Sequence, residues 1–320
     1  MPRPPSGRAT RTMSGSDLIW PPERPRVAAP GSEWSQARSN LCLDFHGDPA
    51  SAQLAVFSDG NHHMALAECV EAFVRRNPGL HEVFYTTTPP SVYLAWMRTG
   101  ELTLGNLTLR VHPNVVIGPR DVVERLHAEG ETGAPVAFAR SRGNAYLVRA
   151  GNPKGIRGVA DLLRPDVIPF MSNPETEAAS YGVYRETMLA MARIRGLDVE
   201  ALERRLSGEG GDIVFGERIH HREAPQALAD GRADVAMVYY HLALRYVRVF
   251  PWEFEMVCEG WDPEGDDNGD EKPAEGMVVT AYAVAPAREV GKWGNGFVTY
   301  MRLDDAVAIY EEHGIQSVRG

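Results

Sequence analysis

The sequence predicts an α/β protein of two lobes, in which loops that follow parallel strands gather at one site. A unit made of a short apolar strand, a polar loop and a helix recurs along the chain, as from Leu54 to Arg76. Strands that alternate with helices are typical of parallel sheets. With 320 residues the chain is long enough for two hydrophobic cores. A strong turn at Gly151-Asn-Pro-Lys-Gly155 follows the first group of these units.

The composition is ordinary for a globular protein and excludes several classes of function. Hydrophobic residues make up 43% of the chain and charged residues 24%. The formal net charge of −10 argues against nucleic acid as a partner, because that partner requires a basic face. No apolar run reaches the roughly eighteen residues of a membrane span. Cys42, Cys69 and Cys258 are too widely spaced for a metal site or a disulfide framework.

Residues 1–40 are predicted to form a disordered or loosely attached tail. Met1 to Gly31 contains basic residues and many prolines, a composition that favours disorder. The apolar core of a secretory signal does not follow these basic residues. The residues alone therefore show no export signal, and a cytoplasmic location stays open.

The first lobe is predicted to span residues 41–140 and 281–320, and its central feature is the loop from Ser58 to His63. Four apolar residues before this loop predict a buried strand, and helical spacing begins at Met64. A loop at the carboxyl end of a strand and the start of a helix favours an anion. Two further units end in Thr86-Thr87-Thr88 and in Gly118-Pro119. The other predicted elements of this lobe are strands at 82–85, 114–117 and 136–138, helices at 64–76, 89–99 and 119–129, and a closing helix at 297–310.

The second lobe is predicted to span residues 141–280, including strands that cross between the lobes. The acidic segment 259–276 loosely echoes a calcium-binding loop, but Pro273 interrupts the pattern, so a surface loop is the better interpretation. The predicted elements are strands at 145–148, 167–171, 213–215, 235–240 and 277–284, helices at 178–195 and 199–206, and a helical turn at 225–231.

Seven segments in this order carry a resemblance to a known family. They are Val56-Phe57-Ser58 with the following helix, Val116-Ile117-Gly118, Phe138-Ala139-Arg140, Gly151-Asn-Pro-Lys-Gly-Ile156 with Val159-Ala-Asp-Leu-Leu163, Asn173-Pro-Glu-Thr176, Ala227-Leu-Ala-Asp-Gly-Arg-Ala-Asp-Val-Ala-Met-Val-Tyr239, and Ile309-Tyr-x-x-His-Gly-Ile315. Together they resemble the molybdate-binding proteins of bacterial ABC transporters, which have the type II periplasmic-binding-protein fold.

The resemblance implies a solute-binding protein without enzymatic activity. Its two lobes, each a mostly parallel sheet flanked by helices, would hold a small inorganic or organic anion in a cleft without a required cofactor. It also implies an ABC transporter permease as partner and a periplasmic location. Carried over by position, the binding residues are Asn61, Thr86 to Thr88, Thr176 to Ala179 and Tyr239. Asn61 stands where the family has a serine, which leaves the identity of the anion open.

Two histidine doublets, His62-His63 and His220-His221, are expected to border this cleft from opposite lobes. Imidazole binds divalent transition metals and also donates to anions when it is protonated. The doublets therefore fit either anion binding or a metal site of these four histidines. Acid–base catalysis by an enzyme of the same fold is a third interpretation. Adjacent side chains diverge, however, so one histidine of each doublet can face the ligand while the other packs.

Five polar residues have two interpretations each. Tyr239 is expected either in the core or at the mouth of the cleft, with Tyr240 in the other position. Arg222 either clamps the anion or pairs with Glu223, and Asp59, like Glu175, is predicted to cap a helix rather than to act as a catalytic carboxylate. The complete predicted ligand-binding set is Ser58, Asn61, His62, His63, Thr87, Thr88, Gly118, Thr176, His220, His221 and Tyr239.

Overall fold

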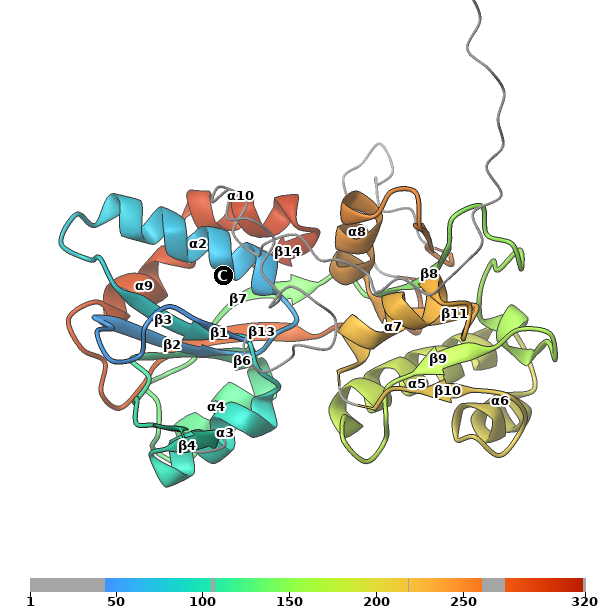
Figure 1. The fold of residues 1–320 in the computed structure, drawn as a ribbon, viewed down its shortest axis with the longest axis horizontal. Helices are drawn as coiled ribbons and strands as arrows, with labels where there is room; N and C mark the ends of the chain where they lie inside the picture. The colour runs from blue at the N-terminus through green and yellow to red at the C-terminus, as the bar shows by residue number, and fades with distance from the viewer. Residues whose placement is uncertain (1–43, 105–106, 218, 261–273, 319–320) are drawn as a thin grey trace, which may run out of the picture.

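Two α/β lobes lie side by side and are joined by strands that cross between them (Figure 1). The computed structural model describes residues 44–104, 107–217, 219–260 and 274–318. The predicted two-lobed α/β fold is confirmed. The predicted tail and most of the acidic loop lie outside the described residues. Within the described ranges, no helix is long and apolar enough to cross a membrane.

Lobe 1 is built around a seven-stranded sheet. Its elements are β1 (Phe45–His46), β2 (Leu54–Ser58), α2 (His63–Arg76), β3 (Val83–Thr86), α3 (Pro90–Thr99), β4 (Leu102–Leu104), β5 (Leu107–Leu109), β6 (Val115–Pro119), α4 (Arg120–Ala128), β7 (Val136–Ser141), β13 (Ala281–Pro286), α9 (Gly294–Tyr300), α10 (Asp304–Glu312) and β14 (Ile315–Ser317). The strand order is β1-β3-β2-β6-β13-β7-β14, and β4 pairs with β5 in a separate hairpin.

Helices cover both faces of this sheet, which explains why the first four residues of its inner strand β2 are all apolar. Successive side chains of a strand point to opposite faces. Leu54 and Val56 of β2 belong to the core under α2, α9 and α10, whereas Ala55 and Phe57 belong to the core under α3 and α4. In Figure 1 the first group of helices lies above the sheet and the second group lies below it. The continuous apolar run of β2 thus reflects burial on both sides.

Lobe 2 has a five-stranded sheet and one continuous core. Its elements are β8 (Asn144–Arg149), the 3-10 helix η2 (Val159–Leu163), β9 (Pro169–Met171), α5 (Ala178–Ile194), α6 (Val199–Leu206), β10 (Val214–Phe215), α7 (His220–Ala229), β11 (Val235–Tyr239), α8 (Tyr240–Val249) and β12 (Phe254–Val257). The strand order is β10-β9-β11-β8-β12.

Both sheets are mixed, which corrects the prediction that each is mostly parallel. The strands β3, β2 and β6 of lobe 1 run parallel, as do β10, β9 and β11 of lobe 2. The crossing strands β8 and β13 pair antiparallel with their neighbours. The chain enters lobe 2 through β7 and β8 and returns through β13. These strands therefore run against the strand–helix units beside them.

Three element predictions were wrong. The closing segment forms two helices, α9 and α10, because the chain turns at Met301 to Leu303 before Asp304 and Asp305 begin α10 in its favourable first turn. Helix α7 begins at His220 and continues through Pro225, so the second histidine doublet lies in a helix rather than a loop. Helix α8 directly follows β11 and was not predicted.

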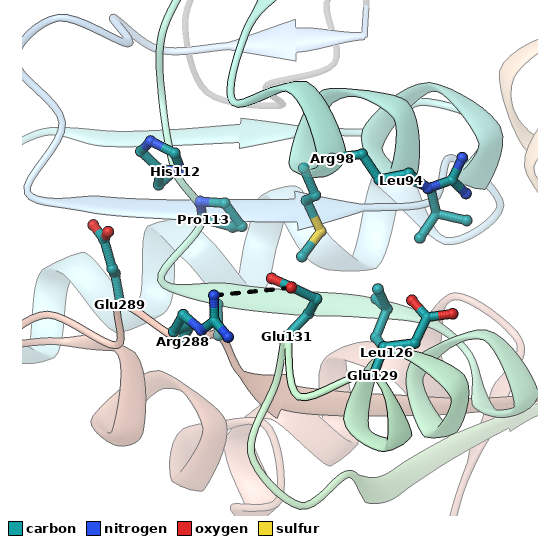
Figure 2. A pocket seen from close by; sticks show the side chains of 11 residues that line it. Leu94, Arg98, His112, Pro113, Leu126, Glu129, Glu131, Arg288 and Glu289 are labelled. Atoms are coloured by element: carbon teal, nitrogen blue, oxygen red, sulfur yellow. Dashed lines mark ion pairs between the residues drawn. The ribbon is translucent and has the colours of Figure 1, made fainter.

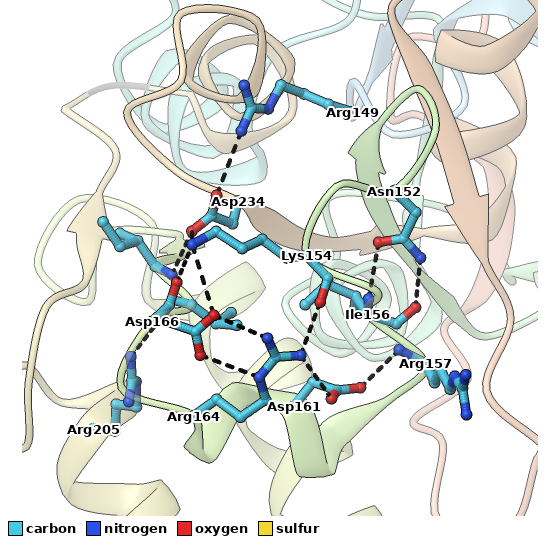
Figure 3. A network of polar contacts seen from close by, with 12 residues as sticks. Arg149, Asn152, Lys154, Ile156, Arg157, Asp161, Arg164, Asp166, Arg205 and Asp234 are labelled. Carbon is cyan, nitrogen blue, oxygen red and sulfur yellow. Dashed lines mark hydrogen bonds and ion pairs between the residues drawn. The ribbon is translucent and has the colours of Figure 1, made fainter.

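The conspicuous turn at Gly151 to Gly155 organises the end of lobe 2 that is remote from lobe 1. The Asn152 side chain closes the turn, because Nδ2 donates to the carbonyl of Ile156 at 2.7 Å and Oδ1 accepts from its N–H at 2.8 Å. Nearby, Asp234 accepts from the N–H of Ile168 at 2.9 Å and lies 3.9 Å from Lys154 (Figure 3). Since Ile168 and Asp234 precede β9 and β11, this network fixes the amino ends of those strands. Their carboxyl ends consequently point toward lobe 1.

Candidate interlobe binding site

The lobes are held against each other by two buried polar contacts. The Nε2 atom of His241, in the first turn of α8, donates to the carbonyl of Asn61 at 2.8 Å. Arg222 of α7 pairs with Asp44 of lobe 1 at 3.0 Å, and both side chains are almost completely buried. These contacts join the loop before α2, the strand edge beside β1 and the starts of two lobe 2 helices. The predicted site loops therefore meet at the interface between the lobes.

The loop between β2 and α2 occupies the centre of this interface. Ser58 and Asp59 are fully buried, with exposed fractions of 0% and 1%. A side chain on Gly60 would place its Cβ 2.5 Å from the carbonyl oxygen of Thr87 and 3.8 Å from Cε1 of His221. Only glycine fits there without displacing its neighbours. Gly60 thus allows the loop to pack between the second loop of lobe 1 and lobe 2.

His62 points from this loop into lobe 1. Its Nδ1 atom lies 2.8 Å from the hydroxyl of Tyr310, and its Nε2 atom lies 2.7 Å from Oδ1 of Asp59. Burial raises the pKa of Tyr310 well above 10, so this hydroxyl stays protonated and can donate to Nδ1. Nε2–H is then left to face the Asp59 carboxylate. His62 is therefore a buried link between Tyr310 and Asp59.

Asp59 has no conventional hydrogen-bond partner in the described part of the chain. The contact with Nε2 of His62 is short, but its geometry does not qualify as a hydrogen bond, and both carboxylate oxygens are left without one. Burial, followed by the Asp59 charge, raises the pKa of Tyr93. Burial, Tyr239 and Asp59 together raise the pKa of Tyr282. Asp59 therefore lies close enough to these phenols to favour their protonated, donating form.

Several buried hydroxyl groups of the two lobes also lack a hydrogen-bond partner among the described residues. Thr88 follows β3, Ser172 follows β9 in lobe 2, and Tyr93 comes from α3. The Tyr93 hydroxyl lies only 2.6 Å from where a Cβ on Gly118 would be, which accounts for the glycine at that predicted position. Buried hydroxyls are normally satisfied. This group, to which Tyr282 also belongs, therefore consists of buried hydroxyls whose hydrogen-bonding capacity is unused among the described residues.

The histidine doublets do not form the predicted four-histidine metal site. His220 packs between Phe170 and Tyr184 inside lobe 2, and its Nε2 donates to the carbonyl of Met237 at 2.9 Å. Burial lowers the pKa of His220 to about 4. Across the interface, the rings that approach each other are His63 and His221, with centroids 6.4 Å apart.

The physical reason is that neighbouring residues at a helix start point about 100° apart, so one member of each doublet turns into its own lobe. Among the described residues, no group of three or more potential metal ligands is present.

The remaining predicted residues have varied surroundings. The backbone N–H of Thr87 donates to the carbonyl of Asp44 at 2.9 Å. Thr176 is exposed beside α5, so the structure does not bring it into the buried interface. Tyr239 and Tyr240 are both buried, which corrects the prediction that one of them lies at the mouth. The hydroxyl of Tyr239 forms a hydrogen bond of 3.2 Å with Thr280, next to the crossing strand β13.

Two predictions about charged residues were wrong. Arg222 pairs with Asp44 rather than with Glu223, whose carboxylate instead accepts from the N–H groups of Glu217 and Ile219. Asp59 caps no helix, because neither of its oxygens accepts a hydrogen bond from the described residues. Glu175 is exposed and likewise does not cap α5, whose first residues lack a side-chain cap.

Sequence reasoning missed His241, Asp44, Tyr93 and Tyr282. His241 could have been found from the apolar run Val235 to Tyr239, since a helix that begins directly after a strand is the same signal as the loop before α2. Asp44 lies next to a two-residue strand with no apolar pattern. Tyr93 and Tyr282 are indistinguishable in sequence from core aromatic residues.

A cavity of about 460 Å³ lies elsewhere in lobe 1 (Figure 2). It is bordered by the carboxyl halves of α3 and α4, by His112 and Pro113 before β6, and by Arg288 and Glu289 after β13. This is the amino end of β6, opposite the end that carries Gly118. Its acidic and basic side chains are mixed, and Arg288 lies 4.0 Å from Glu131. The cavity is therefore separate from the interlobe residues.

Two α/β lobes joined by crossing strands, with buried polar loops where they meet, define the architecture of a solute-binding protein. The chain belongs to the family of bacterial extracellular solute-binding proteins, which it matches over residues 54–316. None of the curated proteins compared with the chain matches it.

Several solved structures share the fold. The sulfate-binding protein SubI of Mycobacterium tuberculosis H37Rv is similar with a TM-score of 0.61 and 17% identity, covering 83% of this chain and 86% of that one. The periplasmic molybdate-binding protein of Azotobacter vinelandii has a TM-score of 0.56 and 15% identity, with 83% and 99% covered. Iron-bound HitA of Pseudomonas aeruginosa has a TM-score of 0.53 and 15% identity, with 82% and 84% covered.

Proposed function

We propose that this chain captures a small tetrahedral oxyanion between its lobes, as the solute-binding component of an ABC-type transporter or of a sensing system. The observation that carries the proposal is the set of buried, unpartnered hydroxyls of Thr88, Tyr93 and Ser172 at the ends of strands or beside them. Oxyanions are strong acceptors, and several converging uncharged donors can hold one without a basic cluster. Binding would satisfy hydroxyls that otherwise lack partners among the described residues.

The family and the shared fold support this proposal. Sulfate-binding and molybdate-binding proteins are among the structures that share the fold. A periplasmic location and a permease partner, which the sequence resemblance implies, are part of the same proposal. Binding of a divalent metal as the cargo is the alternative that the experiment must separate.

The experiment is a thermal-shift panel on protein stripped of bound ions, followed by calorimetry. The panel contains molybdate, tungstate, sulfate, phosphate and arsenate, together with Zn²⁺ and Ni²⁺. A ligand present at a hundred times its Kd stabilises the folded state by about 2.7 kcal/mol, which is readily detected as a rise in Tm. We expect at least one oxyanion, and no requirement for metal.

A matched pair of variants tests the site itself. Thr88→Val should weaken binding of the active oxyanion about tenfold, since one hydrogen bond to a charged group contributes roughly 1.5 kcal/mol or more. Thr132→Val is the control, because Thr132 also carries a buried hydroxyl without a partner in the described residues but lies near the remote cavity. Stabilisation by Zn²⁺ or Ni²⁺, with no response to any oxyanion, would overturn the proposal in favour of metal binding.

A further inference from the structure

We propose that the bound solute presents a proton donor to Asp59, so that the site selects a protonated tetrahedral oxyanion of the hydrogen phosphate class over sulfate, molybdate or tungstate. This inference rests on the proposed function and specifies which oxyanions the site accepts. The residue that decides this is Asp59. An ionised carboxylate cannot donate a hydrogen bond to an anion, so it suits an anion that carries a proton of its own. The hydroxyl donors of the proposed site, by contrast, can donate to any tetrahedral oxyanion.

The first support is the burial of Asp59 without a hydrogen bond. The residue is 1% exposed, and neither carboxylate oxygen has a hydrogen-bond partner in the described ranges. Burying an ionised carboxylate is costly unless it accepts hydrogen bonds. A ligand that carries an O–H group would supply the missing donor.

The second support is the position of Asp59 within the interface. It lies between Ser58 and Gly60, and a side chain on Gly60 would approach both Thr87 of lobe 1 and His221 of lobe 2. Its charge contributes to the raised pKa of Tyr93 in lobe 1 and of Tyr239 in lobe 2. Asp59 therefore lies in the region where groups from the two lobes converge.

The third support is that the neighbouring polar groups of known contact approach only one of the two carboxylate oxygens. His62 approaches Oδ1 at 2.7 Å and is itself held by Tyr310, so it positions the carboxylate from the lobe 1 side. The buried Arg222 across the interface is already paired with Asp44. Oδ2 has neither contact, and it is the atom we assign to the proton of the solute.

These features discriminate by chemistry rather than by size. Phosphate and arsenate keep at least one proton at pH 8, whereas sulfate, molybdate and tungstate keep none. A protonated oxyanion donates its O–H to Asp59 and accepts from the surrounding hydroxyls. A fully deprotonated dianion carries the same charge as hydrogen phosphate but no O–H group, so it leaves the Asp59 carboxylate without a donor. A site built to pair with an O–H group of its ligand strongly rejects an analogue that lacks this group.

The test compares affinities by calorimetry at pH 8 for phosphate, arsenate, sulfate, molybdate and monofluorophosphate. Monofluorophosphate is the sharpest probe, because it has the charge and nearly the shape of hydrogen phosphate without its proton. We expect phosphate to bind at least about tenfold more tightly than sulfate and monofluorophosphate. Asp59→Asn, whose amide can donate, should reduce this preference to less than about twofold. Asp121→Asn, which removes an exposed carboxylate of the same lobe, should leave the preference unchanged.

The wild-type panel keeps the proposal falsifiable even if Asp59→Asn fails to fold. Tight binding of sulfate or molybdate without phosphate would overturn the inference and leave the proposed function standing. Equal affinity for phosphate and monofluorophosphate, or an unchanged preference in a folded Asp59→Asn variant, would also overturn it. No response to any oxyanion would overturn the proposed function, and this inference with it.

Discussion

The start of α2 and the first turn of α7 each carry a histidine doublet, on opposite sides of the interface, yet the two doublets have different partners. In each doublet one ring turns into its own lobe, while His63 and His221 approach each other with centroids 6.4 Å apart. The inward histidines differ in their partners. His62 contacts the polar groups of Tyr310 and Asp59, whereas His220 packs against aromatic rings and bonds one backbone carbonyl.

The charged residue beside each doublet differs as well. On the lobe 1 side, Asp59 is buried without a hydrogen-bond partner in the described chain. On the lobe 2 side, Arg222 is used in an ion pair with Asp44 that joins the lobes. We therefore expect the loop before α2 to contact the proposed ligand and the start of α7 to hold the two lobes together. Four experiments can break or sharpen this division.

The largest effect is expected from Asp44→Asn, which leaves Arg222 buried without its counter-charge. Breaking a buried ion pair typically costs about 3 kcal/mol or more, so closure should weaken and the affinity for the solute should fall by about 100-fold. Calorimetry with the active oxyanion measures this loss. The double variant Asp44→Asn with Arg222→Met should recover part of it, because both charges are then gone. Glu124→Gln, in an exposed pair with Arg120, serves as the control and should change affinity by less than about twofold.

The next effect concerns His220, which the comparison assigns to the core. His220→Ala should lower the free energy of unfolding by about 2–3 kcal/mol, since it removes a buried ring and the donor to the Met237 carbonyl. Urea denaturation measures this change, and His81→Ala at an exposed position is the control. A loss of solute affinity with unchanged stability would instead make His220 a ligand group.

Features that depend on residues close together in the sequence were predicted, whereas features that depend on distant residues were not. Apolar strands such as Leu54 to Phe57 and the polar loops after them are local patterns, and they predicted the two-lobed fold and the loops that meet. The direction of each histidine depends on the exact residue at which a helix begins, and α7 begins five residues before Pro225 suggested. The pairing of Asp44 with Arg222 spans 178 positions and has no local signature.

A smaller effect, of about 2 kcal/mol at pH 5, is expected from His241. Burial lowers its pKa to about 3, from 6.5 in the unfolded chain. Between these values the unfolded state binds more protons, so this contribution is fully present above pH 6.5 and is lost as the pH falls, by up to about 1.4 kcal/mol per unit. His220 acts in the same direction. Glu177, whose pKa burial raises to about 7, acts in the opposite direction between pH 4.5 and 7.

The His241→Gln variant isolates this contribution from the other titrating groups. Wild type and variant are compared by urea denaturation at pH 7.5, 6 and 5, and the difference between them is the relevant quantity. Relative to its own stability at pH 7.5, the variant should lose less on acidification than the wild type does. Parallel stability curves over this range would show that His241 does not titrate as its burial predicts.

The smallest effect is expected where the two doublets meet. His221→Ala removes a partly exposed ring whose centroid lies 6.4 Å from that of His63, and such aromatic contacts contribute about 0.5–1.5 kcal/mol. At the lower end of that range, solute affinity should fall only about twofold. The metal interpretation predicts something different, since two imidazoles that share a Zn²⁺ would make binding strongly dependent on both. Calorimetry of wild type and His221→Ala with the active oxyanion, each with and without Zn²⁺, separates the cases. We expect Zn²⁺ to change neither affinity, and a Zn²⁺-dependent gain that disappears in His221→Ala would establish a metal-assisted contact at this point.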